Sequence, residues 1–280
     1  MNGAIHPLGL SLLLASSLNS ATASFSTDLV GYWNFNETSG SIAHDSSAYS
    51  NNGSLINGGT WANGRIGGAI SFNGINQYLN VPDFPKPTTS FTISTWFYAK
   101  SASLWAPIAA NWGSTYGDFT LSFFSNQGFL SMYVADRRVS GGVEVIPATE
   151  YGLGIAGISG PAISLGSWHH VAVVANADTD TIQFWRDGQA MASVGYSGTF
   201  ITPPVANLTI GGRPSSGRYW DGLIDDLAIW NRPLNQSDVN TIYRNGLAGI
   251  SPVPEPSLTA LCAIGFLLLN LQPTRKAATN

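Results

Sequence analysis

Short apolar runs separated by turn residues recur along the central part of the chain. In the clearest run, residues 91–99, Phe91, Ile93 and Phe97 share one face, while Trp96 and Tyr98 lie on the other. This period of two indicates a β-strand, and aromatic residues on both faces indicate that both are covered or that one lines a groove. Similar patterns predict eleven strands, at residues 30–35, 69–72, 78–81, 91–99, 119–124, 129–134, 168–175, 181–185, 190–194, 208–210 and 223–230.

One segment near the end of this region has helical spacing instead. Residues 237–244 predict a short helix, with Asn235 or Ser237 as its N-cap and Gly246 as its end. Asp187-Gly188 predicts a tight hairpin turn between two strands. About eleven antiparallel strands and one short C-terminal helix predict an all-β fold, a two-sheet jelly-roll sandwich.

The composition agrees with this fold class and narrows the function. Of the 280 residues, 31 are glycine and 15 are proline, which favours turn-rich β structure. A net charge of −4 with twelve Lys and Arg residues argues against a nucleic-acid partner, which needs clustered cations. The single cysteine, Cys262, excludes an intramolecular disulfide and a multi-cysteine zinc site.

The N-terminal end is expected to be a signal peptide, residues 1–23. An apolar run at residues 8–18 is too short to span a bilayer, and Ala21-Thr22-Ala23 after it is typical of a signal-peptidase site. The segment before the run contains no Lys or Arg, so a buried N-terminal strand is the alternative.

The C-terminal end, residues 251–280, has a different pattern. Pro254-Glu255-Pro256 precedes an apolar stretch at residues 258–271, and Arg275-Lys276 follows. This order resembles the PEP-CTERM sorting signal of bacteria. The resemblance implies an exosortase as processing partner, transient insertion of the apolar helix into the membrane, and an exported protein at the cell surface or outside the cell. The alternative is a core strand or helix after a Pro-rich linker.

The order of motifs between the two ends resembles the LamG-like branch of the concanavalin A-like lectin/glucanase superfamily. These motifs are Gly31-Tyr32-Trp33-Asn34-Phe35, Gly68-Ala69-Ile70-Ser71-Phe72, Phe91-Thr92-Ile93-Ser94-Thr95-Trp96, Trp168-His169-His170-Val171-Ala172 and Gly222-Leu223-Ile224-Asp225-Asp226-Leu227. The resemblance implies one jelly-roll domain over residues 24–250. A Gly-rich insertion, residues 140–166, departs from the family pattern and is expected to be a loop at the rim.

The sequence shows no catalytic constellation. Members of this superfamily that hydrolyse glycans carry clustered carboxylates on one strand, and glycoside hydrolysis needs two carboxyl groups about 5–10 Å apart. None of the four glutamates, Glu37, Glu144, Glu150 and Glu255, has an acidic residue two positions away. His169 and His170 are neighbours in a strand, so they point to opposite faces and cannot chelate one ion. We therefore expect no enzyme; a divergent glycoside hydrolase is the alternative.

A structural calcium ion is a candidate cofactor. Calcium prefers carboxylate and carbonyl oxygens, which Asp45 and Asn51 offer on one turn. Asp225 and Asp226 are adjacent acids in an apolar strand and are expected on opposite faces, so only Asp226 joins the predicted set. The resemblance implies that these segments lie close together. The alternative is that Asp45 caps a turn and the strand carboxylates accept hydrogen bonds.

A carbohydrate or the extracellular matrix is the expected partner of this domain. Aromatic rings stack on sugars, and short polar side chains bind their hydroxyl groups. The candidate ligand-binding residues are loop or loop-adjacent aromatics: Trp105, Trp112, Tyr116, Tyr219 and Trp220. A structural or adhesive matrix protein without a small-ligand site is the alternative.

The two ends generate the first prediction. If both signals are processed, the native protein loses the residues up to about Ala23 and is cut near Pro254–Pro256. Intact-mass analysis of protein purified from its own source measures both events. A mature protein that retains both ends would contradict the expected export.

Overall fold

The strands form two large antiparallel sheets and a small two-stranded one in the computed structural model, which describes residues 25–85, 87, 89–112, 117–123, 130–140, 143–145, 148–152, 162–195, 199–200 and 207–253. The two sheets and one helix confirm the all-β sandwich. The predicted signal peptide and sorting motif lie outside the described residues. No helix within the described ranges is long and apolar enough to cross a membrane.

The first sheet has eight strands and contains most of the predicted ones. Its order is β15-β14-β13-β7-β20-β5-β4, and β1 pairs with the second half of β20. These strands are β1 (Leu29–Trp33), β4 (Thr60–Asn63), β5 (Gly68–Asn73), β7 (Phe91–Ala99), β13 (Trp168–Asn176), β14 (Thr181–Arg186), β15 (Gln189–Gly195) and β20 (Asp221–Trp230). The long strands β7, β13 and β20 therefore lie at its centre.

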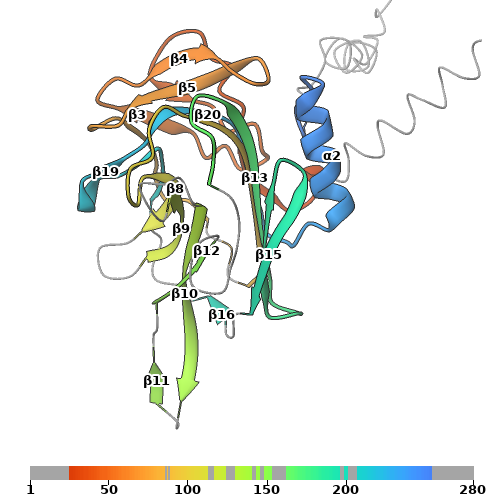
Figure 1. Ribbon diagram of the computed structural model, residues 1–280. Helices are drawn as coiled ribbons and strands as arrows, with labels where there is room; N and C mark the ends of the chain where they lie inside the picture. Colours follow the sequence, from red (N-terminus) through yellow and green to blue (C-terminus); the bar gives the residue numbers. More distant parts are fainter. Residues whose placement is uncertain are drawn as a thin grey trace, which may run out of the picture.

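The second sheet has ten strands, in the order β11-β10-β9-β8-β17-β6-β3-β2, with β12 and β16 also paired to β10. Figure 1 shows β10 and β11 reaching away from the rest of the molecule. The strands are β2 (Ile42–Ala43), β3 (Gly53–Ile56), β6 (Tyr78–Val81), β8 (Pro107–Trp112), β9 (Gly117–Phe123), β10 (Leu130–Ser140), β11 (Val143–Val145), β12 (Ala148–Gly152), β16 (Thr199–Phe200) and β17 (Leu208–Ile210). Because β11 and β12 lie inside the insertion, it is not only a loop.

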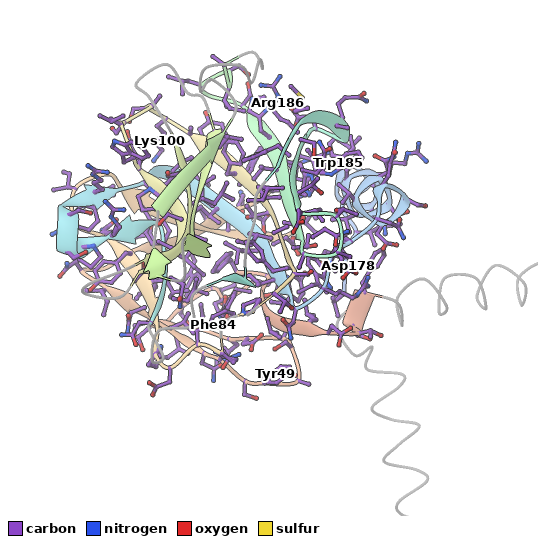
Figure 2. The ribbon with its side chains drawn as sticks, turned by 90° about the horizontal axis from the view of Figure 1, so that it is seen from below. Tyr49, Phe84, Lys100, Asp178, Trp185 and Arg186 are labelled. Atoms are coloured by element: carbon purple, nitrogen blue, oxygen red, sulfur yellow. The ribbon has the colours of Figure 1, made fainter. Side chains whose placement is uncertain are left out.

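Two apolar clusters hold these layers together. The larger lies between the sheets and includes Phe97, Trp33 and Trp220. The smaller covers the opposite face of the eight-stranded sheet, where Trp185 and Trp230 pack with helix α2 (Gln236–Leu247). Figure 2 shows Trp185 beside this helix, and Figure 1 shows α2 along one side of the sheet. Both faces of the central strands are thus covered, which is one of the two arrangements that their alternation indicated.

Helix α2 begins where the sequence indicated and ends later. The side chain of Asn235 accepts a hydrogen bond from the backbone N–H of Asp238, and the side chain of Asp238 accepts one from the backbone N–H of Asn235. The two residues therefore form a capping box. Gly246 does not end the helix but lies buried within it, against Trp96. A Cβ atom at Gly246 would lie 2.4 Å from Nε1 of Trp96, so the glycine permits close packing rather than termination.

Two more features lie beside the sheets. The turn at Asp187-Gly188 has φ values of 48° and 74°, which fits the predicted tight hairpin. The short strands β18 (Gly212–Arg213) and β19 (Arg218–Tyr219) flank the 3-10 helix η1 (Pro214–Ser216) and form the small sheet.

The contact between Trp96 and Gly246 generates the second prediction. Trp96 is 3% exposed and stacks on Tyr243 of α2, with ring centroids 5.6 Å apart. We expect Trp96→Ala to lower the free energy of unfolding by about 3–5 kcal/mol, because it leaves a large cavity. Gly246→Ala should also destabilise the protein, although Gly→Ala in a helix usually stabilises by about 1 kcal/mol. Urea unfolding of both variants and of the wild type measures these changes in the free energy of unfolding.

The double variant is the control for that contact. Once Trp96 is alanine, the added methyl group at position 246 has room, so Gly246→Ala should become neutral or stabilising. A Gly246→Ala variant that is more stable than wild type with Trp96 intact would contradict the packing described.

Candidate functional site

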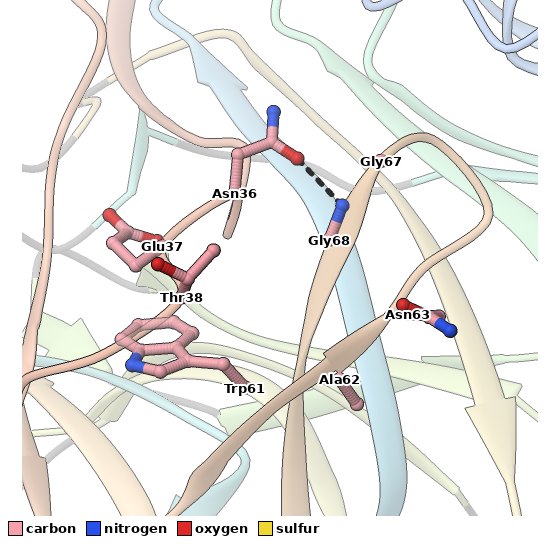
Figure 3. A pocket seen from close by; sticks show the side chains of 8 residues that line it. All are labelled: Asn36, Glu37, Thr38, Trp61, Ala62, Asn63, Gly67 and Gly68. Carbon is pink, nitrogen blue, oxygen red and sulfur yellow. Dashed lines mark hydrogen bonds between the residues drawn. The ribbon is translucent and has the colours of Figure 1, made fainter.

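A pocket of about 430 Å³ lies where the loop after β1 meets β4 and the start of β5. The loop after β1 and the β4–β5 hairpin, which lie more than twenty residues apart in sequence, form its walls (Figure 3). The lining residues are Asn36, Glu37, Thr38, Trp61, Ala62, Asn63, Gly67 and Gly68. The pocket combines one large aromatic ring with amide, hydroxyl and carboxylate groups.

A short hydrogen bond joins two walls of the pocket. The side-chain oxygen of Asn36 accepts from the backbone N–H of Gly68 at 2.6 Å, the bond dashed in Figure 3. Gly67 has a φ of 67°, and a Cβ atom there would lie 2.3 Å from Oδ1 of Asn36. The β1 loop can therefore approach the start of β5 only because this position has no side chain.

The aromatic and acidic groups lie side by side in the pocket (Figure 3). The indole N–H of Trp61 donates to the carbonyl of Gly40 at 3.0 Å, which fixes the half-buried ring. Oε1 of Glu37 accepts from the backbone N–H of His44 at 2.7 Å, whereas its buried Oε2 has no hydrogen-bond partner among the described residues. Glu37 is thus fixed by the backbone of the loop that it faces.

A buried carboxyl group behind the pocket positions its β4–β5 turn. Oδ2 of Asp225 in β20 accepts the backbone N–H groups of Arg65 and Ile66, each at 2.8 Å. A Cβ atom at Gly64 would lie 2.5 Å from the same oxygen. Asp225 therefore holds the turn that connects Trp61 and Asn63 to Gly67 and Gly68, although it does not line the pocket.

Asp225 and Asp226 do not point to opposite faces, so that expectation was wrong. Both are buried, at 0% and 3% exposure, and burial together with the charge of the neighbouring Asp226 raises the pKa of Asp225. The cause is a β-bulge: the pairing with β7 shifts register between Asp225 and Ala228, and Asp226 has a φ of 47°. With this raised pKa, the carboxyl group of Asp225 holds a proton at neutral pH.

The carboxylates of the candidate calcium ligands Asp45 and Asp226 accept hydrogen bonds from neighbouring residues. The carboxylate of Asp45 accepts four hydrogen bonds, from the N–H groups of Tyr32, Ser47 and Asn51 and from the hydroxyl of Ser47. Asp226 accepts from the hydroxyl of Tyr32. Within the described ranges, no three His, Cys, Asp or Glu side chains are grouped to hold a metal ion. Asp45 caps a turn here, and the calcium site stays a prediction.

The candidate aromatic residues lie in different surroundings. Trp105 is half-buried beside Arg218, whose guanidinium lies 5.4 Å from the ring centroid. Tyr219 contacts Tyr78, with ring centroids 6.3 Å apart. Trp220 is fully buried between the sheets and packs edge-on against Phe97, so its faces are not open to a ligand. Tyr116 and the side chain of Trp112 lie outside what the structure describes.

The sequence did not indicate the pocket, because its walls come from two segments that are separate in the sequence. Asn36, Glu37 and Thr38 follow a strand that was predicted, but β4, which carries Trp61, was not. Its alternation covers only four residues, none of them fully buried. The signal that could have found the site is the pair of glycines, Gly67-Gly68, directly before a strand.

A family model described as the concanavalin A-like lectin/glucanases superfamily, Laminin_G_3, matches residues 73–240. No curated protein sequence matches the chain. The family match covers 168 positions of the 280, which is more than half of the chain.

Solved structures resemble this fold at low sequence identity. Domain 4 of an extracellular arabinanase from Geobacillus stearothermophilus, in complex with arabinotriose, is 18% identical, with a TM-score of 0.58 over 76% of this chain and 97% of that domain. The binding domain of Paraclostridial Mosquitocidal Protein 1 is 17% identical, with a TM-score of 0.56 over 78% of this chain and 52% of that one. Trypanosoma rangeli sialidase, in complex with sialic acid, is 16% identical, with a TM-score of 0.54 over 88% and 40%.

The buried pair generates the third prediction, a pH dependence of stability. Burial, and then the neighbouring Asp226, raise the pKa of Asp225 to about 9, against about 3.9 for an unfolded aspartate. Between these values the folded protein holds a proton that the unfolded chain has released. The free energy of unfolding should therefore fall as the pH rises from about 4 to 9, by up to about 1.4 kcal/mol per pH unit.

Asp225→Asn is the matched variant for this measurement. An amide can accept the same backbone N–H groups and donate permanently to Asp226, so the pH slope should flatten. Urea unfolding of both proteins between pH 5 and 9 gives the two slopes. Equal slopes would show that the pair is not the source of the dependence.

Proposed function

Because this chain belongs to the concanavalin A-like lectin/glucanase superfamily, we propose that it is an exported, surface-associated binding module that holds a carbohydrate in the pocket around Trp61. The observation that carries this proposal is the composition of that pocket. An indole ring offers an apolar face to a sugar ring, while Asn36, Thr38 and Glu37 offer groups that bind hydroxyls.

The same lining favours binding over glycoside hydrolysis. The eight residues around the pocket contribute a single carboxyl group, that of Glu37. A glycosidase of the usual kind needs a second carboxyl group about 5–10 Å away to act as nucleophile or base. We infer that the module holds a glycan and leaves its glycosidic bonds intact.

The proposed location rests on the two ends of the chain. The PEP-CTERM-like segment, with its Pro254-Glu255-Pro256 motif, would direct the protein to an exosortase after transient insertion of the apolar stretch into the membrane. The module would then face the extracellular matrix. Val253, the residue directly before this motif, packs against the apolar cluster beside α2.

A glycan-array screen of the purified protein, followed by calorimetry on the best ligand, tests the binding. Arabinooligosaccharides are a suitable first probe, because one structure of similar fold holds arabinotriose. We expect Trp61→Ala to weaken binding at least tenfold, or about 1.4 kcal/mol, through loss of the stacking face. Trp105→Ala is the matched control, since this half-buried tryptophan lies outside the pocket.

Three outcomes separate the alternatives. Glycan binding that Trp61→Ala weakens and Trp105→Ala does not would support the proposal. Binding that depends on Trp105 instead would place the site around Trp105 and not in the pocket. An array with no glycan bound, both with calcium and with a chelator, would contradict the proposal and favour a structural or adhesive matrix protein.

A further inference from the structure

Three side chains outside the pocket are joined by two successive hydrogen bonds. The hydroxyl of Ser164 lies 2.7 Å from Nε2 of His169, and Nδ1 of the same ring lies 2.8 Å from Oδ2 of Asp187. The other carboxylate oxygen of Asp187 accepts the backbone N–H of His170 at 2.9 Å. Serine, histidine and aspartate in this order of contact are the parts of a nucleophilic triad, which is recognised by geometry and not by sequence order.

The surroundings fix how protons are placed in this arrangement. Although burial opposes it, hydrogen bonds from His169 and from the backbone of His170 lower the pKa of Asp187, so its carboxylate is ionised at neutral pH. An ionised carboxylate favours the proton of a neutral imidazole on Nδ1, which leaves the lone pair of Nε2 facing Ser164. The histidine is then placed to take the hydroxyl proton.

A second contact stabilises the ring after it takes that proton. The backbone carbonyl of Ser164 lies 3.1 Å from Nε2 of His169. A carbonyl cannot donate to a neutral ring, but it accepts a hydrogen bond from Nε2–H once the ring is an imidazolium. The charged histidine would therefore be held from both sides, by this carbonyl and by Asp187.

A strand and a tight turn hold His169 and Asp187, and Ser164 lies on an exposed loop. His169 is on β13 at the centre of the sheet, and Asp187 is in the tight β14–β15 turn. Ser164 lies between Ile163, which is buried in the main core, and Gly166, whose N–H donates to the carbonyl of Ala99 at 2.9 Å. The exposed residue after Ser164, Leu165, offers apolar surface to an acyl chain.

We propose that Ser164, His169 and Asp187 form a nucleophilic site that takes an acyl group from a short-chain ester. Oγ of Ser164 attacks the ester carbonyl while its proton moves to Nε2 of His169. The bond from the carbonyl carbon to the alcohol oxygen breaks, and the alcohol leaves with that proton. Water then releases the acid by the same steps in reverse order and restores the serine. This site shares no residue with the carbohydrate pocket.

Two reagents on the full chain test the assignment. A fluorophosphonate forms a stable bond between phosphorus and an activated serine oxygen as fluoride leaves, and peptide mapping identifies the serine. We expect Ser164 to be labelled at least about 100-fold faster than the exposed Ser167 in the same turn, since general-base catalysis contributes about 10²–10⁴-fold. With 4-nitrophenyl acetate, we expect 4-nitrophenol release that Ser164→Ala abolishes and Ser167→Ala leaves unchanged.

Variants of the other two residues separate chemistry from folding. His169→Gln should lower the labelling rate of Ser164 about 100-fold or more. Asp187→Asn keeps an acceptor for His170 but can donate to Nδ1, so the ring proton should move to Nε2, which ¹⁵N spectra of the imidazole detect. Labelling should then fall while the melting temperature holds.

The same measurements can overturn the proposal. Labelling of Ser164 no faster than that of Ser167 would contradict it. Labelling that survives both His169→Gln and Asp187→Asn in folded protein would also contradict it. Because carbohydrate binding is measured separately through Trp61, failure here leaves the proposed binding function standing.

Discussion

The buried carboxyl group of Asp225 is the contact on which the pocket depends. It lies in the central strand β20, where one oxygen accepts the N–H groups of Arg65 and Ile66. These two residues form the turn between β4 and β5, the strands that carry Trp61 and Gly68. An unpaired buried carboxylate would be costly; here the turn donates two hydrogen bonds to one oxygen, and burial raises the pKa of the group, so it holds a proton. The interior of the sandwich thus shapes its binding surface.

The β-bulge at Asp225 and Asp226 also shifts the alternation of β20 by one position, since Ile224 faces the core before it. Beyond it, Leu227 and Ile229 face the core between the sheets, while Ala228 and Trp230 face helix α2. The helix covers this second face closely, with Gly246 against Trp96. Both faces are covered here, and the pocket lies at the edge of the sheet, beside β4, while Ser164 lies beside the first residues of β13.

Local patterns in the sequence predicted eleven of the strands, but neither β4 and β8 nor the sites. The alternation over residues 91–99 predicted the bounds of β7 and both its faces, and Asn235, one of the two N-cap candidates, caps α2. The bulge at Asp226 was not predicted, because a positive φ in a non-glycine residue leaves no local signal in the sequence. Contacts between distant residues, such as Asn36 with Gly68 or Ser164 with Asp187, depend on strand register, which a single sequence does not specify.

Hydrogen exchange in the β4–β5 turn tests the central claim most directly. If Asp225 holds this turn, Asp225→Ala should make the backbone amides of Arg65 and Ile66 exchange at least about tenfold faster, because their buried acceptor is gone. The amides of β13, which do not contact this carboxyl group, serve as the internal reference and should stay protected. Unchanged exchange at Arg65 and Ile66 in the folded variant would contradict the account.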